Sequence, residues 1–87
     1  MEDVEAKVRE VLLEILDITP EEVVPTARFA DDLRATSIDL VEIVAVLQNT
    51  LDVDIDEAQV ARLRTVQDAV EFFRAAVAAR RGGPEPS

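Results

Sequence analysis

The fold is decided between residues 29 and 51, which read FADDLRATSIDLVEIVAVLQNTL. Apolar side chains in this stretch recur at the three- and four-residue spacing of a single helix face: Leu40, Ile43, Val44, Leu47 and Leu51. Thr36 precedes them, and Asp39 follows Thr36 by three positions, which is the spacing of a capping box at the start of a helix. The pattern predicts a helix that begins at Thr36 or Ser37 and ends at Leu51.

An earlier helix is predicted from a second set of apolar side chains at the same spacing: Val4, Val8, Val11, Leu12, Ile15 and Leu16. Asp3 is placed to act as its N-cap. The helix should end near Asp17, because Pro20 disfavours helical backbone at Thr19.

A long connection, about residues 18–36, joins these two helices. We expect Val23, Val24 and Phe29 to anchor it against the bundle, and a short helical turn is predicted at residues 21–23. A connection of this length inside a small domain is often functional.

After residue 51 the pattern predicts a short helix at residues 57–63 and a final helix opened by Thr65, with Asp68 in a capping-box position. The apolar face of this last helix is supplied by Val66, Ala69, Val70, Phe73 and Val77. Residues 80–87 read as a disordered tail or linker after a domain at residues 1–79. Because no segment alternates with period two, we predict an all-α four-helix bundle with three main helices, one short helix and a long first loop.

Composition narrows the function. The chain has 87 residues and neither Cys nor His, which argues against thiolate or imidazole catalysis and against most zinc sites. Its net charge of -10 should repel nucleic acid and anionic membranes and attract basic protein surfaces. No signal-peptide pattern and no apolar run of membrane-spanning length is found, so we expect a cytoplasmic protein without nucleic-acid or membrane partners.

The segment at residues 29–42 resembles the modification motif of acyl carrier proteins. In that family a Phe and an Asp-Asp-Leu run precede an Asp-Ser-Leu triplet at the start of the second helix, and the family Ser matches Ser37. Residues 52–55 and 65–70 resemble the end of the family's second helix and the opening of its last one, so the resemblance covers about residues 4–77.

The resemblance implies an acyl carrier that is not itself an enzyme. Ser37 is expected to carry covalent 4′-phosphopantetheine, attached by a phosphopantetheinyl transferase that uses coenzyme A and magnesium. The implied partners are acyl-loading and acyl-processing enzymes, such as a ketosynthase or an acyltransferase, with basic docking surfaces.

Elementary chemistry fits Ser37 to this role. A helix N-terminus leaves backbone N–H groups unpaired and carries partial positive charge, which suits a phosphate. If Thr36 caps the helix, the Ser37 hydroxyl is not needed for capping and can face solvent. The alternative interpretation is that Ser37 is an ordinary N-cap without any modification.

Docking residues are predicted around Ser37 from charge and from a second apolar stripe. Residues 36–61 contain no Lys or Arg. The stripe consists of Ile38, Val41 and Ala45, and it either contacts partners and shelters cargo or is simply buried in the bundle. The full set of predicted docking residues is Thr36, Ile38, Asp39, Val41, Glu42, Ala45 and Asp54.

The sequence departs from the family pattern near the modification site. Thr36 stands where the family has Asp, and Arg34 stands where it commonly has Gly. These departures favour a specialised discrete carrier of polyketide or fatty-acid type. A peptidyl carrier and an unmodified acidic interaction module with the same fold remain alternatives, and an enzyme that uses the carboxylates of Asp31, Asp32 or Asp39 is a third.

Overall fold

Each of the three long helices begins at a side-chain cap that the sequence provides. Asp3 accepts a hydrogen bond from the Ala6 amide, and the Thr65 hydroxyl accepts one from the Asp68 amide at 3.1 Å. The computed structural model describes residues 3–82, which form one 3-10 turn and four α-helices: α1 (Val4–Ile15), η1 (Pro20–Glu22), α2 (Ser37–Leu51), α3 (Glu57–Val60) and α4 (Val66–Gly82).

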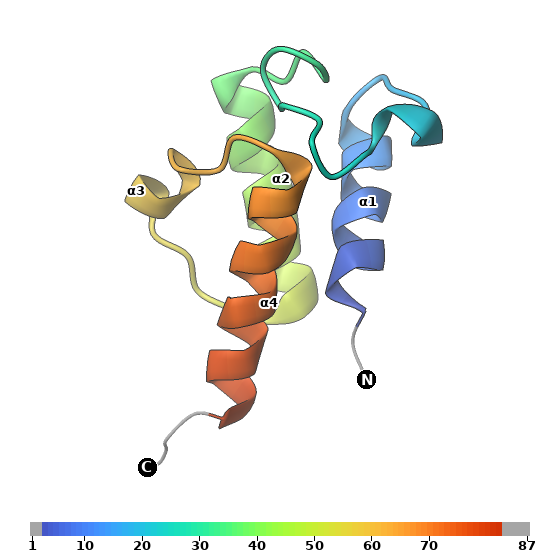
Figure 1. Ribbon diagram of the computed structural model, residues 1–87. Coiled ribbons are helices and arrows are strands. Elements are labelled where there is room, and N and C mark those ends of the chain that lie inside the picture. The colour runs from blue at the N-terminus through green and yellow to red at the C-terminus, as the bar shows by residue number, and fades with distance from the viewer. Residues whose placement is uncertain (1–2, 83–87) are drawn as a thin grey trace.

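The helices form the predicted all-α bundle of three main helices and one short one (Figure 1). α1 runs opposite to α2 and α4 and packs against both, while α3 packs against α2. The side chains at the centre of the core are almost completely buried: Val8, Leu12, Leu47, Leu51 and Phe73. None of the described helices is long and apolar enough to cross a membrane.

Four predicted helix bounds need correction. The short turn predicted at residues 21–23 lies at Pro20–Glu22. α1 ends at Ile15, before Asp17, because the backbone becomes extended at Leu16. α3 covers only residues 57–60 of the predicted 57–63. α4 continues through residue 82, so residues 80–82 of the expected tail are helical. Residues 83–87 of that tail lie outside the described residues.

The long first connection lies over the end of the bundle where α2 and α4 begin (Figure 1). Val23 and Phe29 anchor it as predicted, but the prediction for Val24 was wrong, since this side chain is 44% exposed. The Arg9 guanidinium of α1 donates to the Val23 carbonyl at 2.6 Å, and the Phe29 amide donates to the Arg64 carbonyl at 2.9 Å. The connection is therefore fixed both to α1 and to the segment that leads into α4.

Candidate functional site

The start of α2 presents an exposed hydroxyl that its helix does not use. The Thr36 hydroxyl accepts from the Asp39 amide at 3.1 Å, and the Asp39 carboxylate accepts from the Thr36 amide at 3.0 Å. This capping box confirms the predicted cap and makes Ser37 the first helical residue. Ser37 is exposed, and its hydroxyl has no hydrogen-bond partner among the described residues.

The same helix end suits a phosphate group. Among residues 3–82, no acceptor is found for the backbone N–H groups of Ser37 and Ile38. Exposed N–H groups at the positive end of a 15-residue helix favour an anion. The free hydroxyl and the unpaired amides thus fit a phosphodiester attached at this position.

A groove opens directly beside the Ser37 side chain. It has a volume of about 400 Å³ and is lined mainly by apolar side chains. We call it the attachment groove, and its lining residues are Ser37, Leu40, Val41, Val60, Ala61 and Leu63. Because α3 and the segment after it supply half of this lining, the groove depends on contacts between distant parts of the chain.

The second apolar stripe of α2 is exposed, which settles the alternative between a surface and a buried role. The Ile38 side chain is 78% exposed and Val41 is 52% exposed. Glu42 and Ala45 are also exposed and share this face of the helix. Large apolar side chains that stand free beside an unused hydroxyl are typical of a contact surface.

Not all of the predicted docking residues have free polar groups near Ser37. The polar atoms of Thr36 and Asp39 are occupied by the capping box. Asp54 is exposed but follows the C-terminal end of α2, about 20 Å along the helix axis from Ser37. The structure therefore places Ile38, Val41, Glu42 and Ala45 on one exposed face of α2 that begins next to Ser37, and it leaves Asp54 at the opposite end of the helix.

Arg34 adopts a left-handed backbone conformation, with a φ of 58°. Its neighbours Leu33 and Ala35 are buried, and their amides donate to the carbonyls of Arg28 and Phe29 at 3.0 and 2.7 Å. The loop therefore imposes this conformation, which glycine adopts without steric cost. This explains physically why the related motif commonly has Gly at the position of Arg34.

We expect Arg34→Gly to stabilise the fold. Removing the Cβ should raise the free energy of unfolding by about 1 kcal/mol, net of the greater entropy of glycine in the unfolded chain. Urea denaturation measures the change. Arg62→Gly is the matched control, because Arg62 is exposed and has a negative φ, while the loss of charge is the same. If Arg34→Gly raises the free energy of unfolding no more than Arg62→Gly does, the backbone at Arg34 is not strained.

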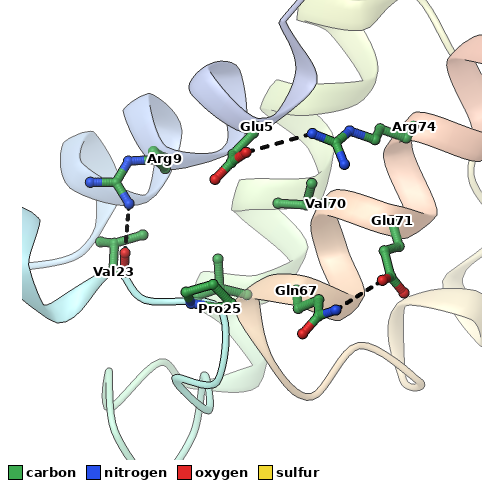
Figure 2. A pocket seen from close by; sticks show the side chains of 9 residues that line it. Glu5, Arg9, Val23, Pro25, Gln67, Val70, Glu71 and Arg74 are labelled. Atoms are coloured by element: carbon green, nitrogen blue, oxygen red, sulfur yellow. Dashed lines mark hydrogen bonds and ion pairs between the residues drawn. The ribbon is translucent and has the colours of Figure 1, made fainter.

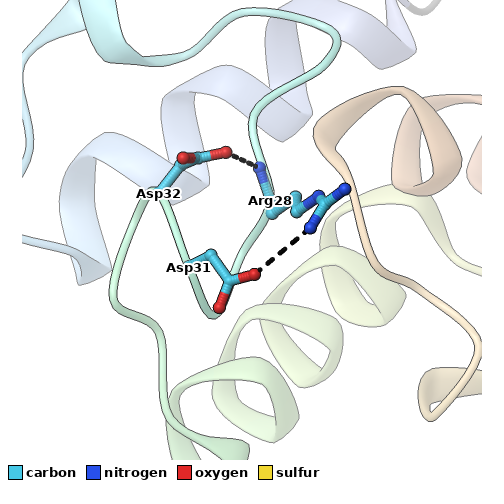
Figure 3. A network of polar contacts seen from close by, with 3 residues as sticks. All are labelled: Arg28, Asp31 and Asp32. Atoms are coloured by element: carbon cyan, nitrogen blue, oxygen red, sulfur yellow. Dashed lines mark hydrogen bonds and ion pairs between the residues drawn. The ribbon is translucent and has the colours of Figure 1, made fainter.

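The carboxylates considered for catalysis are used in local structure instead. The Asp32 carboxylate accepts from the Arg28 amide at 2.7 Å, and the Asp31 carboxylate pairs with the Arg28 guanidinium at 3.4 Å (Figure 3). Asp39 belongs to the capping box. Each of these carboxylates therefore has a partner within its own loop or helix cap.

A further hollow of about 330 Å³ lies between α1 and α4 and shares no residue with the attachment groove. Four of its polar side chains form two pairs (Figure 2): Arg74 with Glu5 at 3.5 Å, and Gln67 with Glu71 at 3.0 Å; Arg9 donates to the Val23 carbonyl. Each of these polar side chains thus already has one partner in or beside the hollow.

Comparison with known proteins identifies clear relatives. A family model described as a phosphopantetheine attachment site matches residues 6–73. An acyl carrier protein of Thermosynechococcus vestitus is 41% identical over 73 residues, covering 84% of this chain and 90% of the relative. An acyl carrier protein of Phenylobacterium zucineum is 40% identical over 74 residues, covering 85% and 94%.

A solved structure shares the fold. The acyl carrier protein from Enterococcus faecalis superposes with a TM-score of 0.72 at 27% sequence identity, covering 84% of this chain and 92% of that chain.

Proposed function

Because this chain belongs to the acyl carrier protein family, whose members bear covalent 4′-phosphopantetheine, we propose that Ser37 is the attachment point and that the protein carries acyl intermediates to partner enzymes. The arm supplies a terminal thiol to which acyl groups are joined as thioesters. The observation that carries the assignment to Ser37 is its exposed, unpartnered hydroxyl at the capped start of α2.

Attachment needs an external enzyme. Among residues 3–82 no side chain hydrogen-bonds the Ser37 hydroxyl, so a base for its activation is expected from the transferase. In the proposed step the Ser37 oxygen bonds to the phosphorus of coenzyme A that carries the pantetheine group. The bond from that phosphorus to the bridging oxygen of the diphosphate breaks. The adenosine bisphosphate leaves with the bonding electrons, and the hydroxyl proton passes to a base on the phosphopantetheinyl transferase.

Partner enzymes, including a ketosynthase or an acyltransferase, would dock on the exposed face of α2. Ile38 and Val41 supply apolar contact area, and Glu42 supplies negative charge beside Ser37. The chain's net charge of -10 should speed the approach of a basic surface, and this effect should weaken as salt is raised. We propose that catalysis resides in these partners and that the carrier supplies positioning.

The test of the proposed function is in vitro loading. The purified full chain is incubated with coenzyme A, magnesium and a broad-specificity phosphopantetheinyl transferase, and its intact mass is followed. We expect one arm to be added per chain. If the folded chain stays unmodified with several transferases and still binds basic partner proteins, the alternative of an unmodified interaction module is correct.

The apolar docking residues can be tested with a matched substitution. Val41→Ala should lower the kcat/KM of transferase loading severalfold, and Ile38→Ala should lower it by roughly tenfold, because each removes contact area at the centre of the surface. Val24→Ala is the control, since Val24 is also a half-exposed valine but lies in the first connection. Equal effects of the two valine substitutions would argue against docking on α2.

The type of carrier is also a proposal. We favour a discrete carrier of polyketide or fatty-acid type over a peptidyl carrier, because Ala35 and Thr36 precede Ser37 where peptidyl carriers usually have glycine. The cytoplasmic location remains a prediction, as does the division into a carrier domain and a tail, although α4 extends beyond the predicted boundary at residue 79.

A further inference from the structure

We propose that the cargo of this carrier is an acyl chain bearing keto or hydroxyl oxygens, and that the Arg64 guanidinium binds those oxygens in a second hollow next to the attachment groove. This inference rests on the proposed attachment at Ser37. We call the second hollow the distal hollow. Its volume is about 500 Å³, and the lining residues used in the argument are Arg28, Asp31, Leu40, Leu63, Arg64 and Asp68.

The two hollows are neighbours, because they share two lining residues. Leu40 and Leu63 line both the attachment groove and the distal hollow. Ser37 lines the first of them, and Leu40 lies one helical turn further along α2. If the arm on Ser37 folds back so that its cargo enters the groove, the cargo meets these two leucines, which also border the distal hollow.

The distal hollow has an available hydrogen-bond donor. Arg28 is already engaged with Asp31 at 3.4 Å, and the Asp68 carboxylate accepts the amides of Arg64 and Thr65, both at 3.2 Å. The Arg64 guanidinium, by contrast, has no hydrogen-bond or ion-pair partner among the described side chains. Its five N–H groups can thus bind incoming acceptor oxygens.

The backbone of Arg64 is held in place on both sides. Its amide donates to Asp68, and its carbonyl accepts from the Phe29 amide at 2.9 Å. An anchored backbone leaves only the side-chain rotamers of Arg64 to be ordered when cargo binds, which lowers the entropic cost of binding.

The chemistry of the distal hollow favours an oxygenated chain over a saturated one. Charged side chains from Arg28, Asp31, Arg64 and Asp68 line it together with the leucines. A saturated chain lying there would shield these charged groups from water without replacing their hydrogen bonds. A chain with oxygens at intervals places its methylenes on Leu40 and Leu63 and its oxygens at Arg64.

The experiment compares two cargoes of equal length on the full chain. A transferase loads Ser37 with synthetic arms that carry either an octanoyl or a 3,5-dioxooctanoyl group through a stable amide bond. Nuclear magnetic resonance then follows the Nε–H signals of the arginines and the methyl signals of Leu40 and Leu63. We expect the dioxo cargo to shift the Arg64 and Leu63 signals and the octanoyl cargo to leave Arg64 unmoved.

Arg64→Gln should reduce the docked fraction of the dioxo cargo by roughly tenfold, because it removes a charged donor. Arg62→Gln is the matched control: Arg62 is an exposed arginine of the same segment that lines neither hollow, and its loss should change nothing. Equal shifts from both cargoes, or shifts that persist in Arg64→Gln, would overturn the inference. Intact mass shows which hypothesis has failed. A chain that does not accept the arm contradicts the proposed function, whereas a loaded chain without these shifts contradicts only the role of Arg64.

Discussion

Substitution of Ser37 by alanine is expected to abolish phosphopantetheine addition completely. The substitution removes the exposed hydroxyl at the start of α2 that the capping box does not use. Thr36 provides the cap, so the helix should still form and the variant should unfold at nearly the same urea concentration as the parent chain. Intact-mass spectrometry after incubation with a transferase measures the loss.

The sequence supplies a matched control for this variant, because Ser37 and Ser87 are its only serines. Ser87→Ala should load at the rate of the parent chain. Full loading of Ser37→Ala, or loss of loading in Ser87→Ala, would place the arm elsewhere and contradict the assignment.

Phe73→Ala should cause the largest loss of stability. Phe73 in α4 is completely buried, and its ring meets that of Phe72 edge to face at a centroid distance of 5.5 Å. Deleting such a ring costs about 3–5 kcal/mol, the transfer free energy plus the cavity left behind. Since small domains are stable by only about 5–15 kcal/mol, the variant should be close to unfolding in water.

Urea denaturation measures this loss, and Phe72→Ala is its control. Phe72 carries the same side chain at the neighbouring position but is only partly buried, so its replacement should cost clearly less. Equal losses at the two positions would show that Phe73 is not central to the core.

The parts of the site that depend on local chemistry were predictable from the sequence. The Thr36–Asp39 box lies within one helical turn, so spacing alone predicts the cap and the position of Ser37. The exposure of Ile38 was not decided by periodicity, because a second apolar stripe on a central helix is compatible with either burial or exposure.

The remaining features depend on contacts between distant segments. Nothing in the sequence order places Leu63 and Val60 opposite Ser37, so the attachment groove was not predicted. Val23 and Val24 are adjacent valines in a connection that has neither helical nor strand periodicity. The sequence therefore does not show which of them is buried, and only the packing does. The left-handed backbone of Arg34 had one available signal, the glycine common at that place in the related motif.

The most direct test of the central claim is mass spectrometry of the protein recovered from the cell that produces it. Intact mass, followed by fragmentation of the peptide that contains Ser37, locates any modification and identifies its cargo. We expect phosphopantetheine on Ser37, with an acyl group in part of the population. A chain that is wholly unmodified at Ser37 although its own transferase is present would contradict the account.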